Sequence, residues 1–508
     1  MFHLSDLYLV SPELSLVFVA LAVMLVDLFV KRRIVTVTVA LVGLVIPVAL
    51  TISLAFALDF SVPHEAFFNM LVVDPYAIYF KIVFLLIAAV MILASYSYVG
   101  KYVKAEGEFY ALMLFSVTGM MLIASTSELI SIYISFELLS IPLYVMAGLI
   151  RFNERSAEAA VKYVLLGAMS SAVLLYGFAL LYGLTGTTDL KGIATSLGSS
   201  VQNGNLIVLV ADILILAGFG FKISAVPFHM WAPDIYEGAP TPATAFFSVG
   251  SKAAGFAALI RVFIDGGLWN VNLSTLVIAV SIIAILTMTL GNVVALVQSN
   301  VKRMMAYSSI ANAGYILVGF VASLAGKSSD GTVAVLFFIL VYVLTNLGAF
   351  SGIIALADAT GGERIDDFRG LAKRAPLLSL GTALCLLSLA GIPPMAGFVS
   401  KVFIFTAAWG ESQSLLAQGN SLLSGWLVAL VVIGLINSVI SMVYYGRIVK
   451  SMYFDAPLKE DHLTTPLGLS SSITFATAAL VVITFAAQLV LLADSPAANS
   501  LLAFLVGR

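Results

Sequence analysis

The sequence predicts an all-α polytopic membrane protein. Of its 508 residues, 61% are hydrophobic and only 10% are charged, and the mean hydropathy is +1.08. Soluble domains carry about 25% charged residues, so this composition excludes an ordinary soluble domain. The apolar residues gather in stretches of about 20, which is the length that an α-helix needs to cross a bilayer.

Fourteen such stretches follow one another along the chain. The expected transmembrane helices span residues 12–30, 36–59, 75–98, 108–125, 127–150, 158–184, 205–235, 241–264, 271–297, 303–322, 331–357, 377–410, 424–446 and 468–494. Sixteen of the 25 lysines and arginines fall in alternate loops, including the loop Asp358–Pro376. The positive-inside rule therefore places those loops in the cytoplasm and both termini outside.

Two of the expected helices are interrupted by proline. Pro227 lies in the seventh, and Pro393 and Pro394 follow Gly391 in the twelfth. Proline has no N–H and crowds the carbonyl four residues earlier, so each helix is expected to break there. Broken helices at membrane depth are tolerated only where protein or water receives the freed backbone groups. Such breaks are typical of ion pathways in transporters.

The spacing of the breaks predicts the organisation of the chain. The broken helices are five crossings apart and so run in opposite directions, as inverted repeats require. We therefore expect two inverted five-helix repeats, with helices 4–8 in residues 106–264 and helices 9–13 in residues 265–455. Residues 1–105 would hold helices 1–3, and residues 456–508 would hold helix 14 and a short tail.

Charged residues inside the expected helices are candidates for function, because a lysine at the bilayer centre costs about 2.5–3.5 kcal/mol. Four lie well within helices: Glu137, Lys222, Lys252 and Lys401. Burial and a nearby carboxylate act in opposite directions on a lysine, so its charged and neutral forms can come close in energy. The pattern favours a proton relay. The structural alternatives are an ion pair, a cap on a helix end, or a lysine that snorkels to the interface.

Other charged residues give weaker signals. His229 follows the first break, and Lys162 lies about one turn inside the sixth helix, where snorkelling also explains it. Lys81 and Asp212 lie near helix ends, and we interpret them as anchors. The eleventh helix has no acidic residue, lysine or histidine, so a relay from Lys252 to Lys401 would have to cross it on Tyr342, Thr345, Asn346 and water.

Several other classes of site are excluded. The single cysteine, Cys385, rules out internal disulfides and cysteine-ligated iron–sulfur or zinc sites. There is no Walker A loop, and the net charge of −2 with no basic run argues against a nucleic-acid partner. The sequence therefore predicts no cofactor or metal site in this chain.

Five phrases resemble the antiporter-like membrane subunits of respiratory complex I, the bacterial NADH–quinone oxidoreductase. They are GEFYALMLFSVTGMMLIAS, FELLSIPLYVMAGL, the stretch from Lys222 to Lys252, VKRMMAYSSIANAGYILVG and LSLAGIPPMAGFVSK, spread over residues 107–401. Only Ser495–Arg508 follow the last expected helix, whereas the largest member of the family adds a lateral helix there. The resemblance is therefore strongest to the branch called subunit N, or subunit 2 in other lineages.

The resemblance implies a function and a set of partners. The family has fourteen helices in two inverted repeats with broken helices 7 and 12, and is thought to pump protons. Carried over residue by residue, Glu137 looks like the glutamate paired with Lys222, Lys252 like the central lysine and Lys401 like the terminal lysine. NADH, FMN, iron–sulfur clusters and quinone are expected in partner subunits. Other membrane subunits of complex I, especially neighbouring antiporter-like ones, would surround the chain in the bacterial inner membrane.

Two alternatives to a proton-translocating subunit of the oxidoreductase stay open. The chain could belong to a multisubunit cation/proton antiporter, which has the same core. It could also be a non-conducting scaffold that only joins neighbouring subunits. A scaffold should tolerate the loss of Lys252, whereas a pump should not.

Overall fold

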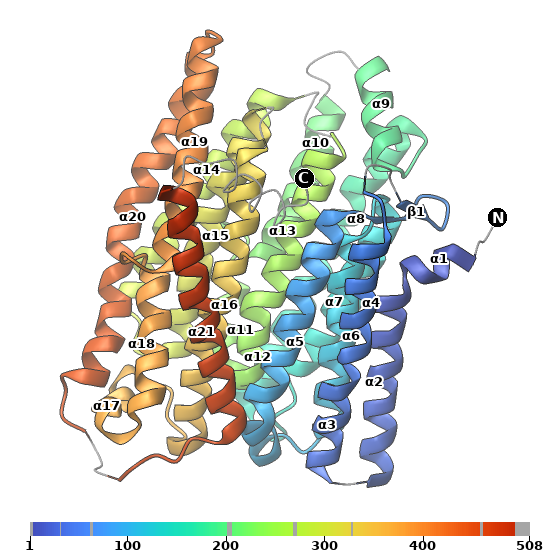
Figure 1. Ribbon diagram of the computed structural model, residues 1–508. Coiled ribbons are helices and arrows are strands. Elements are labelled where there is room, and N and C mark those ends of the chain that lie inside the picture. Colours follow the sequence, from blue (N-terminus) through green and yellow to red (C-terminus); the bar gives the residue numbers. More distant parts are fainter. Residues whose placement is uncertain are drawn as a thin grey trace.

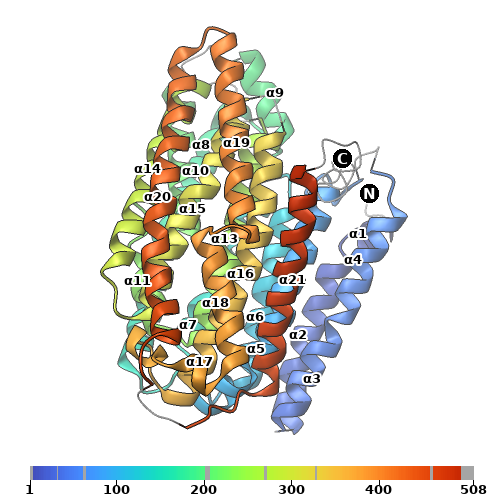
Figure 2. The same cartoon turned by 60° about the vertical axis from the view of Figure 1, so that its left-hand side comes forward.

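The computed structural model is a bundle of long helices (Figures 1 and 2). The structure describes residues 4–30, 32–60, 64–200, 206–267, 272–326, 329–457 and 461–492. The expected tail Ser495–Arg508 and the basic residues Lys31, Lys327, Lys459 and Arg508 lie outside the described residues.

The helices follow one another with short connections. They are α1 (Leu4–Leu9), α2 (Ser11–Val30), α3 (Arg33–Gly43), α4 (Val45–Ala57), α5 (Pro75–Tyr102), α6 (Glu106–Ala124), α7 (Leu129–Ala147), α8 (Glu154–Thr185), α9 (Leu190–Ser200), α10 (Leu206–Ile223), α11 (Trp231–Gly238), α12 (Thr241–Phe246), α13 (Lys252–Ile260), α14 (Leu273–Leu296), α15 (Val301–Ala325), α16 (Asp330–Thr360), α17 (Leu371–Arg374), α18 (Pro376–Ala390), α19 (Ala396–Ala417), α20 (Ser421–Tyr453) and α21 (Leu467–Leu492). Two π-helical segments, η1 (Phe247–Ser251) and η2 (Arg261–Asp265), flank α13, and η4 (Ile365–Phe368) is a 3₁₀-helix.

The expected membrane-spanning architecture is confirmed in outline. Within the described residues, 13 helical segments are long and apolar enough to cross a membrane, and the shorter apolar helix α18 lies in the expected twelfth crossing. The total of fourteen crossings, the inverted repeats and the domain boundaries at 106, 265 and 456 stay predictions.

Both expected helix breaks are present. Helix α10 ends at Ile223, and α11 begins only at Trp231. Helix α18 ends at Ala390, and α19 begins at Ala396. The seventh and twelfth expected crossings are therefore each made of two helices with a non-helical segment between them.

Some elements were not expected from the sequence. The strands β1 (His64–Ala66) and β2 (Leu71–Val73) form an antiparallel hairpin before α5, and α9 is a short helix in a segment expected to be a loop. The expected eighth helix is not a uniform α-helix, because η1 lies between α12 and α13. A π-helical segment inside an α-helix is frequently found at functional sites.

The most deeply buried helices lie in the middle of the bundle. In an apolar 18-residue stretch of each span, 94% of the residues are buried for Thr241–Ile264 and all of them for α15, against 28% for α2. Figures 1 and 2 show α2, α3 and α4 along one edge and α19 and α20 toward the other. Lysines on the central helices are thereby enclosed by protein.

Helix α5 connects both halves of the bundle. The hydroxyl of Tyr76 donates to the carbonyl of Ala257 on α13 (2.8 Å), and the hydroxyl of Tyr79 donates to the carbonyl of Leu336 on α16 (2.7 Å). A helix outside both expected repeats is thus hydrogen-bonded to each of them.

The orientation in the membrane has a direct test. Figure 1 places α9 and α17 at opposite ends of the bundle. Cysteines at Thr195 on α9 and at Asp366 on η4 would both be exposed, whereas the native Cys385 is buried. We expect a membrane-impermeant thiol reagent to label Thr195→Cys from outside and Asp366→Cys only from the cytoplasm. The reverse pattern would overturn the predicted orientation.

Candidate functional site

The first break is stabilised by hydrogen bonds from neighbouring protein. Ser224 adopts a left-handed conformation (φ 58°), and the N–H of Ala225 donates back to the carbonyl of Gly220 (2.7 Å). The N–H of Val226 donates to the hydroxyl of Thr287 on α14 (3.0 Å), and the indole N–H of Trp231 donates to the carbonyl of Phe221 (2.9 Å). These bonds satisfy backbone groups that lipid could not.

Lys222 lies in the last turn of α10, next to this break, and is 3% exposed. Its ammonium donates to the hydroxyl of Ser140 on α7. It also lies 5.7 Å from the ring centroids of Phe136 and Tyr144 and 6.0 Å from that of Phe221. Aromatic faces attract a cation at this distance, so the cage partly replaces the lost hydration of the charge.

Glu137 lies beside Lys222 but is not in direct contact with it. Its carboxylate accepts a hydrogen bond from Ser171 on α8, and among the described residues no ion pair joins it to Lys222. Glu137 and Ser140 are three residues apart on α7, so they share one face of the helix. Ser140 therefore lies one helical turn from the carboxylate and in contact with the ammonium. Glu137 itself is half-buried, on a face of α7 where Ile134 and Ile141 are exposed.

Lys252 is the first residue of α13, directly after the π-helical segment η1, and is 2% exposed. Its ammonium has no hydrogen-bond partner within the described part of the chain, and neither has the hydroxyl of Ser251. A buried charge without a partner is costly. Lys252 therefore differs from Lys222, whose charge has both an acceptor and an aromatic cage.

The second break is shaped around Lys401, which is 4% exposed. Its ammonium donates to the carbonyls of Leu389 (3.3 Å) and Ala390 (3.0 Å) at the end of α18, and to the hydroxyl of Ser438 on α20 (3.0 Å). Gly391 has a positive φ of 79°, and a Cβ there would lie 2.9 Å from the lysine side chain. A glycine is therefore required both for the turn and for the approach of Lys401.

The two breaks use the same kind of support from a neighbouring helix. A threonine hydroxyl accepts a backbone N–H in each: Thr287 on α14 from Val226, and Thr484 on α21 from Ala396 (3.0 Å).

Lys162 and His229 lie apart from the three buried lysines. Lys162 is 39% exposed and is paired with Asp234 (2.7 Å) and Glu158 (2.6 Å). Arg303 adds to this cluster through Asp234 (2.8 Å), and the group lines a polar pocket of about 240 Å³ at the surface. His229 is half-buried within the non-helical segment of the first break.

The interpretation of Lys81 and Asp212 as anchors near helix ends is wrong. Lys81 is fully buried and forms an ion pair with Glu13 on α2 (2.9 Å). Asp212 is also fully buried, and neither carboxylate oxygen has a hydrogen-bond partner among the described residues. Both residues lie nearly two turns inside their helices, and this depth in the sequence could have indicated that they are buried. Nothing in the sequence indicates that the partner of Lys81 is Glu13, 68 residues away.

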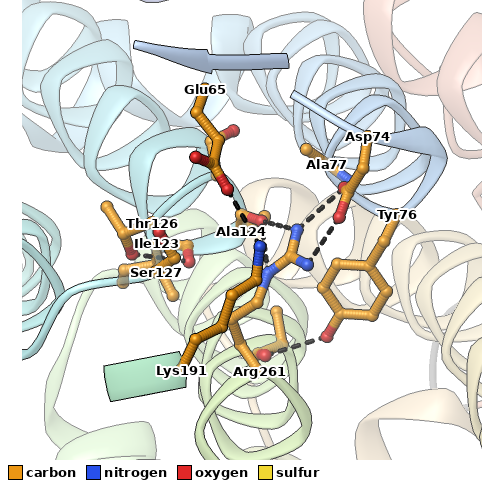
Figure 3. Close-up of polar contacts among 12 residues, drawn as sticks. Glu65, Asp74, Tyr76, Ala77, Ile123, Ala124, Thr126, Ser127, Lys191 and Arg261 are labelled. Atoms are coloured by element: carbon orange, nitrogen blue, oxygen red, sulfur yellow. Dashed lines mark hydrogen bonds and ion pairs between the residues drawn. The ribbon is translucent and has the colours of Figure 1, made fainter. Parts of the chain in front are cut away.

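A second polar centre missed by sequence reasoning surrounds Arg261 (Figure 3). The guanidinium binds both oxygens of Asp74 (2.6 and 2.8 Å), donates to the carbonyl of Ala124 (2.7 Å) and lies 4.5 Å from the ring centroid of Tyr76. Burial alone would raise the pKa of Asp74, but the charge and hydrogen bonds of Arg261 outweigh it and lower that pKa. This clamp joins the start of α5, the end of α6 and the start of η2.

The described residues contain no cluster of three or more His, Cys, Asp or Glu side chains suited to a metal ion. What the geometry offers is three buried amines, one half-buried carboxylate, and hydroxyls between them. Such groups can hold and exchange protons.

Comparison with known proteins identifies the family of the chain. Residues 126–448 match the family model described as NADH:quinone oxidoreductase/Mrp antiporter, TM. A relative from Desulfitobacterium hafniense, named NADH-quinone oxidoreductase subunit N, is 45% identical over 80% of this chain and 81% of its own length.

Solved structures give the same result. A chain of respiratory complex I from Thermus thermophilus with bound aureothin has a TM-score of 0.74 and 32% identity, covering 95% of this chain and 99% of that one. A chain of the Mrp complex from Dietzia sp. has a TM-score of 0.80, covering 98% of this chain and 96% of that one, but at 19% identity it shows the fold alone. The chain belongs to the NADH:quinone oxidoreductase/Mrp antiporter transmembrane family, in the branch that holds subunit N of NADH-quinone oxidoreductase.

Proposed function

We propose that the chain is a proton-translocating membrane subunit of NADH–quinone oxidoreductase. The observation that carries the proposal is the near-complete burial of Lys222, Lys252 and Lys401, each next to an interruption of regular α-helix. Three amines are costly to bury at membrane depth, and the family to which the chain belongs gives them a use.

In the proposed mechanism, Glu137 controls the charge on Lys222. The ammonium is now held by Ser140 and the aromatic cage, one helical turn from the carboxylate. When Glu137 approaches, it favours the ammonium form; when it withdraws, desolvation favours release of the proton towards Lys252. Pro142, inside α7, and Pro227, in the break, leave backbone carbonyls free next to each partner, which allows the distance to change.

Lys252 would act as the central acceptor and Lys401 as the terminal one. The unpartnered amine of Lys252 can take a proton without breaking an existing hydrogen bond. Lys401 holds its proton against the carbonyl ends of α18, where the helix dipole favours a cation. Lys162 and His229 are weaker candidates for the relay. The charge of Lys162 is already neutralised by two carboxylates at the surface.

The proposed setting is the bacterial plasma membrane, with both termini outside. The chain would assemble with other membrane subunits of the oxidoreductase, including neighbouring antiporter-like ones. NADH, FMN, the iron–sulfur clusters and quinone would bind to partner subunits, and this chain would contribute proton transfer.

Purification from native membranes tests the proposal. We expect the chain to copurify with proteins that carry flavin and iron–sulfur clusters, and the complex to acidify the lumen of vesicles when NADH reduces quinone. Copurification with small membrane proteins only, together with sodium-dependent proton exchange, would replace the proposal with a cation/proton antiporter. Normal pumping by Lys252→Met in the assembled complex would favour a scaffold.

A further inference from the structure

Helix α16 separates the helix that carries Lys252 from the helix that carries Lys401. It packs against α12, η1 and α13 on one side and against α19 on the other. Yet residues 331–357 of α16 include no acidic residue, lysine or histidine. A proton that passes between the two lysines therefore has to cross α16 on uncharged groups.

Tyr342 is the polar group of α16 that reaches the segment of Lys252. It is 4% exposed, and its hydroxyl lies 3.1 Å from the carbonyl oxygen of Ser248 and 2.9 Å from the hydroxyl of Ser309. Ser248 belongs to η1, one turn before Lys252. A carbonyl only accepts, so when Tyr342 donates to it, the Ser309 hydroxyl is free to donate to Tyr342.

The same tyrosine lines a small cavity beside Lys401. The cavity holds about 10 Å³, and its polar lining comes from Asn312, Tyr342, Thr345, Ser388, Ser400 and Lys401. One water requires roughly 10–15 Å³ and two to four polar partners, so the cavity has room for about one water. Tyr342 therefore touches both the segment of Lys252 and the cavity of Lys401.

We propose that the hydroxyl of Tyr342 carries protons across α16, between Lys252 and Lys401. The inference rests on the proposed relay and specifies how it passes a helix without charged groups.

The transfer balances without a redox partner. The Tyr342 hydroxyl first turns from the Ser248 carbonyl toward the cavity. The Lys252 ammonium, which has no direct hydrogen-bond partner among the described residues, then gives a proton through water to the Tyr342 oxygen as the original O–H hydrogen passes to the cavity water. That water gives one of its own hydrogens to the neutral amine of Lys401. One proton moves, Lys252 becomes neutral, Lys401 becomes charged, and Tyr342 and the water are regenerated.

The test is Tyr342→Phe in the complete complex, reconstituted in vesicles. The phenyl ring preserves the packing and removes only the hydroxyl. We expect the rate of proton pumping to fall at least about tenfold, since a positioned proton-transfer group contributes about 10²–10⁴-fold to a rate. Tyr444→Phe is the matched control, because Tyr444 is also fully buried and hydrogen-bonded, to Asn292 (3.0 Å), but does not line the cavity.

The outcomes separate this inference from the relay itself. Loss of pumping in Tyr342→Phe with normal pumping in Tyr444→Phe supports the inference. Wild-type pumping in Tyr342→Phe, or an equal loss in both variants, overturns it. Lys252→Met is measured in parallel. If Lys252→Met loses pumping while Tyr342→Phe does not, only the role of Tyr342 is wrong. If Lys252→Met pumps normally, the relay is wrong as well.

Discussion

Replacing Lys222 with alanine is expected to lower proton pumping by the assembled complex at least about tenfold, on the scale of a lost proton-transfer group. The variant removes the buried ammonium and leaves Ser140 and the aromatic cage without a cation. Because pumping and electron transfer are coupled in such a complex, quinone reduction should slow as well. Proton uptake by vesicles and NADH oxidation, measured on the same preparation, give the two rates.

The partner variant Glu137→Gln should have a similar effect, because it keeps the shape of the side chain and removes the charge that acts on Lys222. Lys191→Ala is the matched control, since it removes an exposed lysine on α9 whose ion pair with Glu65 lies at the surface. If Lys222→Ala and Glu137→Gln both assemble and both pump at the wild-type ratio, the two residues are structural and the relay assignment fails.

Replacing Lys81 with methionine is expected to destabilise the protein by about 3–5 kcal/mol, the usual cost of removing one partner from a buried ion pair. The methionine fills most of the lysine volume, so the main effect is to leave the Glu13 carboxylate buried and unpaired. Thermal unfolding in detergent, followed by the loss of helical circular dichroism, should show a clear fall in the midpoint temperature.

The double variant Glu13→Leu with Lys81→Leu separates charge from packing. Replacing both partners of a buried pair with apolar residues is often neutral or stabilising, so most of the lost stability should return. Lys191→Met, which breaks an exposed pair, should change stability by only about 0–1 kcal/mol. A Lys81→Met variant no less stable than Lys191→Met would show that the Glu13–Lys81 pair contributes little.

The features that the sequence predicts well are those with a local cause. Pro227 and Pro393 each remove a backbone donor, and both breaks are where the sequence places them. The apolar stretches predict the long helices for the same reason, because the preference of each side chain for lipid or protein does not depend on distant segments. The short connection between the expected helices 108–125 and 127–150 is also found, between α6 and α7.

The features that the sequence does not predict depend on contacts between distant segments. Lys81 and Lys222 look alike in the sequence, as single lysines among apolar residues. Only the fold shows that one faces Glu13 and the other faces Ser140 and three rings. The π-helical segment before Lys252 was likewise not predicted from the sequence. The direct Glu137–Lys222 pairing that the two charges suggest is replaced by separate contacts with Ser171 and Ser140.

The contacts of Lys401 lead to a count of hydrogens. Its ammonium has three hydrogens, and the structure gives it three acceptors, the carbonyls of Leu389 and Ala390 and the hydroxyl of Ser438. A neutral amine has only two hydrogens and one lone pair. The two carbonyls can then keep both hydrogens, while the Ser438 hydroxyl rotates and donates its own hydrogen to the lone pair. The direction of the Ser438 hydroxyl would thus depend on whether the lysine is charged. The carbonyls at the end of α18 would stay hydrogen-bonded to the lysine in either state.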